Sequence, residues 1–80
     1  MSKNKTYLIH SEHTSETEDM WQLVFDHQAG AWSVEHFWAY QETRSRGSKR
    51  RTILDFEKTT AGRRLAENLR EALKRAEDDA

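Results

Sequence analysis

The chain has no cysteine and no proline, and only three glycines among its 80 residues. The absence of cysteine excludes a disulfide and a thiolate zinc site. No apolar run approaches the roughly 20 residues that span a bilayer. The N-terminal residues also lack the apolar core of a signal peptide. We therefore expect a cytoplasmic protein without a membrane segment.

The length predicts one small domain, residues 1–80, with frayed ends at 1–5 and 77–80. A domain of this size buries only about 60–65% of the surface that its unfolded chain exposes. Without a disulfide, the remaining sources of buried area are large aromatic side chains and self-association. Three Trp, three Phe and two Tyr residues supply the first source.

Residues 21–40 hold all three tryptophans, and apolar residues alternate with polar ones on either side of Gly30. Such alternation is typical of strands, so we predict strands at 20–26 and 31–40. Residues 27–30 fit a four-residue turn in which Gly30 supplies the positive φ angle. The segment therefore predicts a β-hairpin.

The side-chain period of two decides which residues of this hairpin share a face. Pairing Asp26 with Ala31 gathers the aromatic residues on one face, and the other face is mixed. A slip of one residue would place the aromatics opposite Ser33 and Glu35, so the register should be well specified. The predicted pairs on the aromatic face are Phe25–Trp32, Leu23–Val34 and Trp21–His36, with Trp38 and Tyr40 continuing that face.

The segments around the hairpin are less regular. Residues 6–10 predict a first strand, and the polar residues 11–19 predict a loop. Residues 41–51 are either a flexible loop or a second turn. We favour the turn, with residues 50–54 returning as a fourth strand. Asp55 could instead cap a helical turn.

A helix is predicted from Thr60, because Leu65, Leu69 and Leu73 recur every four residues. The hairpin has one aromatic face and this helix has one leucine stripe, so each can cover the other. We expect an α+β fold, an antiparallel β-meander of three or four strands packed on one C-terminal amphipathic helix. Part of the sheet would then be open to solvent or to a second copy. This pattern is common among small bacterial and phage proteins, but it indicates no function.

The polar residues form no recognisable reaction centre. The four histidines lack the convergent spacing of a zinc site. We expect His10, His13 and His27 to be exposed and His36 to be packed and hydrogen-bonded. No serine lies in a Gly-x-Ser-x-Gly turn, and Glu35 and His36 point to opposite faces. We therefore predict no enzyme, no catalytic residue, no cofactor, no metal ion and no small-molecule substrate.

The net charge of −1 conceals a basic island, since residues 44–64 hold eight Lys or Arg residues and two acids. Residues 44–51, the basic segment, are suited to phosphates, and neighbouring aromatics to base stacking. The alternative is a solvated turn that pairs with the acidic residues 11–19 or protects an edge strand. A pI of about 6.4 favours this alternative. The candidate contact residues are Trp38, Tyr40, Arg44, Arg46, Lys49, Arg50 and Arg51.

Two functions remain open. The first is a non-enzymatic protein-interaction module that binds a protein partner or a second copy of itself, because one helix cannot cover all the aromatics. The second is nucleic-acid binding through Arg44–Arg51. The position of Trp38 distinguishes them. Contact between the exposed aromatics and the basic segment would favour nucleic acid, and separation would favour protein association.

Overall fold

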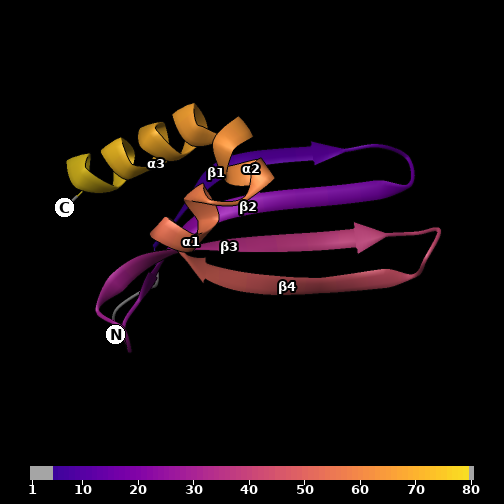
Figure 1. Cartoon of the computed structure of the whole chain (residues 1–80), viewed down its shortest axis with the longest axis horizontal. Coiled ribbons are helices and arrows are strands. Elements are labelled where there is room, and N and C mark those ends of the chain that lie inside the picture. The colour runs from indigo at the N-terminus through magenta and orange to yellow at the C-terminus, as the bar shows by residue number, and fades with distance from the viewer. Residues whose placement is uncertain (1–4, 80) are drawn as a thin grey trace.

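The computed structural model describes residues 5–79, in which a four-stranded antiparallel sheet precedes three helices (Figure 1). The fold is α+β as predicted, and the fourth strand is present. Every strand pairs with its neighbour in sequence, in the order β1-β2-β3-β4. The elements are β1 (Thr6–His13), β2 (Thr17–Asp26), β3 (Ala31–Tyr40), β4 (Ser45–Thr52), α1 (Ile53–Glu57), α2 (Thr60–Arg64) and α3 (Ala66–Asp78).

The central hairpin has the predicted register. Asp26 pairs with Ala31, and the three aromatic-face pairs form as expected. Gly30 has a φ of +67°, and its N–H donates to the Asp26 carbonyl over 2.8 Å. The Asp26 carboxylate also accepts from the backbone N–H of Gln28 and Ala29, at 3.0 and 3.3 Å. The turn is therefore fixed by both its glycine and its aspartate.

The predicted loop at 11–19 is wrong, because only residues 14–16 separate β1 from β2. The Thr14 N–H donates to the Thr17 carbonyl over 2.8 Å, and the Thr14 hydroxyl accepts from the Thr17 N–H over 3.0 Å. These bonds close a tight turn. The strands here are polar because the helices do not reach this end of the sheet (Figure 1).

The predicted C-terminal helix is present as α3, which packs on β1 and β2, and two short helices that were not predicted, α1 and α2, precede it. The Thr52 hydroxyl caps α1 by accepting from the Asp55 N–H over 3.1 Å. The Thr59 hydroxyl caps α2 by accepting from the Gly62 N–H over 2.9 Å. Asp55 is therefore not a cap, and β4 ends at Thr52 rather than at residue 54.

The helices cover one half of one sheet face. We call this the helix-side face, and the opposite one the open face. α3 contacts β1 and β2, whereas α1 contacts β3 and β4. The other half, which we call the turn end, extends past the helices to the β1–β2 and β3–β4 turns (Figure 1). The core consists of Ile9, Trp21, Leu23, Val34, Phe56, Leu65, Leu69, Ala72 and Ala76.

A β-bulge, which the sequence pattern did not reveal, shifts the β1–β2 register between Leu8 and His10. The shift lets Ile9 reach the core at 5% exposure while His10 still faces Trp21. The Leu8 carbonyl accepts from the Arg75 guanidinium, which ties α3 to the edge strand β1.

No helix within residues 5–79 is both long enough and apolar enough to cross a bilayer. The fraying expected at residues 1–5 and 77–80 stays a prediction. Residues 1–4 and 80 lie outside the described part of the chain, and α3 continues to Asp78.

Candidate functional site

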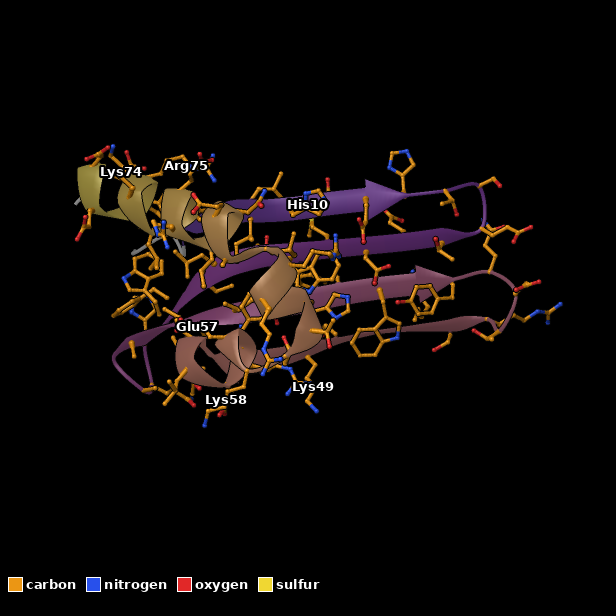
Figure 2. The ribbon with its side chains drawn as sticks, turned by 45° about the horizontal axis from the view of Figure 1, so that its top comes forward. His10, Lys49, Glu57, Lys58, Lys74 and Arg75 are labelled. Carbon is orange, nitrogen blue, oxygen red and sulfur yellow. The ribbon has the colours of Figure 1, made fainter. Side chains whose placement is uncertain are left out.

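The turn end of the helix-side face carries three rows of side chains that run across the sheet. The inner row begins with His10 at the β1 edge and ends with Lys49 at the β4 edge (Figure 2). The rows are His10–Trp21–His36–Lys49, Glu12–Asp19–Trp38–Gly47 and Thr17–Tyr40–Ser45.

Trp38 lies half-buried in the middle row, directly over Gly47 of β4. A Cβ atom on Gly47 would approach Trp38 Cζ2 to 2.9 Å, so glycine makes room for the indole. The Trp38 ring centroid is 5.4 Å from that of His36, and His36 stacks on Trp21 at 4.6 Å and 8°. The aromatic rings therefore form a continuous ladder from the buried core to the basic segment.

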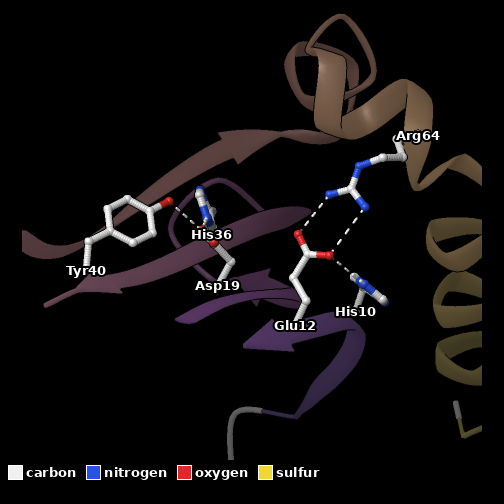
Figure 3. A network of polar contacts seen from close by, with 6 residues as sticks. All are labelled: His10, Glu12, Asp19, His36, Tyr40 and Arg64. Atoms are coloured by element: carbon white, nitrogen blue, oxygen red, sulfur yellow. Dashed lines mark hydrogen bonds and ion pairs between the residues drawn. The ribbon is translucent and has the colours of Figure 1, made fainter. Parts of the chain in front are cut away.

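Asp19 forms hydrogen bonds with two of the side chains beside Trp38, His36 and Tyr40 (Figure 3). Its Oδ1 accepts from Tyr40 Oη over 2.7 Å and from His36 Nε2 over 2.8 Å. The Asp19 side chain is 17% exposed. The hydrogen bond from Tyr40 to Asp19, together with burial, raises the pKa of Tyr40 above its usual value of 10.0. Because Asp19 fell in the predicted loop, sequence reasoning missed it.

A second polar group fastens α2 to the same face (Figure 3). The Arg64 guanidinium donates to Glu12 Oε1 over 3.1 Å and lies 5.7 Å from the Trp21 ring centroid. The same Glu12 carboxylate lies 3.3 Å from His10 Nε2. His10 is therefore half-buried and not exposed as predicted. These contacts mean that both acids on this face, Glu12 and Asp19, already have partners.

The basic segment forms most of β4, which is one free edge of the sheet. Strand alternation divides its cations between the two faces. Lys49 and Arg51 lie opposite His36 and Val34 on the helix-side face, whereas Arg46 and Arg50 lie on the open face. Arg44 lies in the β3–β4 turn at a φ of +51°.

Only one of these five cations forms an ion pair within the described part of the chain. Arg50 lies 3.5 Å from Glu35 Oε2 and 4.0 Å from Asp26 Oδ2. The expected pairing with the acidic residues 11–19 does not form. Arg44, Arg46, Lys49 and Arg51 therefore remain available to an anionic partner.

The remaining histidines behave differently from one another. His13 and His27 are exposed as predicted, and His36 is packed and hydrogen-bonded but lies at the edge of the core. No three His, Asp or Glu side chains within residues 5–79 come together as a metal-binding group.

The structure brings Trp38 and Tyr40 against the basic segment, through the pairs Trp38–Gly47 and Tyr40–Ser45. Contact between the aromatic residues and the basic segment is therefore a property of the fold. Comparison of the chain with family models, curated proteins and solved structures gives no match.

Proposed function

We propose that this protein binds single-stranded nucleic acid across the turn end of its helix-side face. The observation that carries the proposal is the position of the Trp38 ring over Gly47, in the middle of the basic segment. An aromatic ring beside unpaired cations is the combination that single-strand binders use, since bases stack and phosphates pair. This contact reverses the order of the two functions expected from the sequence.

Single strands fit this surface better than duplexes. The bases of a single strand can unstack and present their faces to an aromatic ring, whereas a duplex hides those faces. Trp38 is only half-buried, and Tyr40 lies on the same face one row further out. A strand that follows β4 would pass these rings with its phosphates near Arg44 and Lys49.

The acidic pI does not oppose this role, because the acids on this face are paired. Asp19 accepts from Tyr40 and His36, and Glu12 binds Arg64. The unpaired charges nearest Trp38 are those of β4, so the local potential is positive where a strand would bind. The cytoplasmic location expected from the sequence would give access to such strands.

The test is fluorescence anisotropy with labelled oligo(dT) and oligo(U) of roughly 12 nucleotides, a length within the range of known single-strand sites. Trp38→Ala should weaken binding by about 5- to 150-fold, the effect of losing one stacked base worth about 1–3 kcal/mol. Phe37→Ala is the matched control. Phe37 is the sequence neighbour of Trp38, but its side chain points to the open face, so this variant should leave the affinity unchanged. Equal losses in the two variants would reject the proposed surface.

Salt dependence provides a second readout of the same proposal. If Arg44, Lys49 and Arg51 contact three phosphates, log K should fall against log salt with a slope of about −2. A slope near zero, or no binding to either oligonucleotide at low salt, would contradict the proposal.

A second candidate function is self-association through the open face. Leu8 is 50% exposed there, and Met20 and Phe37 form a cross-strand pair beside a hollow of about 400 Å³. A two-fold axis along β3 would place Glu18 against the partner's Arg46 in both directions. Opposite charges and an apolar centre therefore favour a second copy as the occupant.

A further inference from the structure

A small cavity lies on the helix-side face, between β3 and β4 on one side and the α1–α2 segment on the other. Its volume of about 130 Å³ would hold about four water molecules at roughly 30 Å³ each, the size of a small polyatomic ion. The residues that line it are Trp21, Val34, His36, Lys49, Arg51, Phe56, Thr59 and Ala61.

The cavity has two cations on its β4 side and buried apolar side chains at its floor. Lys49 and Arg51 project from the same face of β4, and neither forms an ion pair within the described residues. No carboxylate belongs to the lining. The buried side chains of Trp21, Val34 and Phe56 close its floor. A ligand that enters from the rim therefore cannot continue through the protein.

We infer that this cavity binds a terminal phosphate of the nucleic-acid strand, a specificity that rests on the proposed function. A phosphate monoester carries a charge of about −1.5 to −2 near neutral pH, which matches the two cations. A diester within the strand carries a single charge and would need an exit for the chain. Arginine also forms two parallel hydrogen bonds to phosphate oxygens, which adds geometric selectivity.

The cavity lies within reach of the stacking surface. His36 lines the cavity, and its ring centroid is 5.4 Å from that of Trp38. A terminal nucleotide can therefore place its phosphate beside Lys49 and Arg51 while its base lies on Trp38. The strand then continues along the turn end of the sheet.

The experiment compares three oligonucleotides of one sequence, with a 5′-phosphate, a 3′-phosphate or hydroxyls at both ends. One phosphorylated form should bind about tenfold more tightly than the hydroxyl form, the gain expected from added charge-assisted contacts. Lys49→Gln and Arg51→Gln should each remove this preference. Arg46→Gln is the matched control, because its side chain lies on the open face. It should leave the ratio of the three affinities unchanged.

A separate titration with inorganic phosphate at constant ionic strength, followed by NMR of His36 and Trp21, tests the cavity without nucleic acid. Phosphate-dependent shifts that Lys49→Gln abolishes would support the cavity even if no oligonucleotide binds and the proposed function fails. Equal binding of all three oligonucleotides would overturn the inference and leave the proposed function standing. No response to any of these ligands would reject both.

Discussion

At the scale of single residues, Asp19 has the largest structural role that the sequence pattern did not reveal. Its Oδ1 atom accepts from both His36 and Tyr40, which lie on β3. These bonds fix the strand that carries Trp38. The polar residues around Trp38 therefore hold the stacking surface in position.

Tyr40 gives this arrangement a measurable pH dependence. The hydrogen bond to Asp19 raises the pKa of folded Tyr40 above the usual 10.0. The associated stability is complete below pH 10 and is lost as the pH rises through the higher folded pKa. Tyr40→Phe should lower the free energy of unfolding near neutral pH by about 0.5–1.5 kcal/mol. It should also reduce the loss of stability above pH 10.

Urea unfolding of wild type and Tyr40→Phe, at neutral pH and above pH 10, measures both effects. Tyr7→Phe is the control, because the pKa of Tyr7 is also raised, by burial first and then by Asp79. In Tyr7→Phe, the free energy of unfolding should still fall above pH 10 by the amount that Tyr40 contributes. An identical alkaline profile in wild type and Tyr40→Phe would contradict the role of Asp19.

At the scale of elements, the junction of α1 and α2 depends on one glycine. A Cβ atom on Gly62 would lie 1.8 Å from the Phe56 carbonyl oxygen and 3.0 Å from Glu57 Cα. Both neighbours are backbone atoms, so neither can move without displacing α1. The close approach therefore sets how tightly α2 packs against α1.

Gly62→Ala should therefore destabilise the protein by about 1–3 kcal/mol or more, the usual cost of overpacking. Chemical denaturation measures the change. The neighbouring exposed variant Arg63→Ala is the control, and we expect it to stay within about 0.5 kcal/mol of wild type. A Gly62→Ala protein as stable as this control would show that α1 and α2 are not packed so closely.

The elements also show which parts of the structure the sequence could predict. The β2–β3 register was predictable, because one face is buried and Gly30 marks the turn. The ends of β1 and β2 were not, since strands exposed on both faces have no hydrophobic alternation. Trp38 and the basic segment were found as candidates because they are visible in the local sequence. Asp19 and Glu12 were missed because they lie in the strand ends that the sequence did not predict. Their roles depend on strand pairing that no local pattern specifies.

At the scale of the whole molecule, none of the three helices within residues 5–79 covers the open face of the sheet. If two copies associate through this uncovered face, as in the second candidate function, the protein is a dimer. Light scattering should then give about twice the 9.5 kDa chain mass. Phe37→Glu should yield monomers, because it places two charges at the centre of the interface. Trp38→Ala, on the other face, should stay dimeric, and a monomeric wild type at high concentration would exclude this assembly.

The strand order β1-β2-β3-β4 also has a consequence for how the chain folds. Because each strand pairs with the next one in sequence, only short turns must close before the sheet forms. Folding can begin at the β2–β3 hairpin and add one strand on each side. We expect the helices to dock after the sheet, since Leu65 and Leu69 pack against a face that includes Trp21 and Leu23. Local contacts of this kind favour rapid folding for a sheet protein.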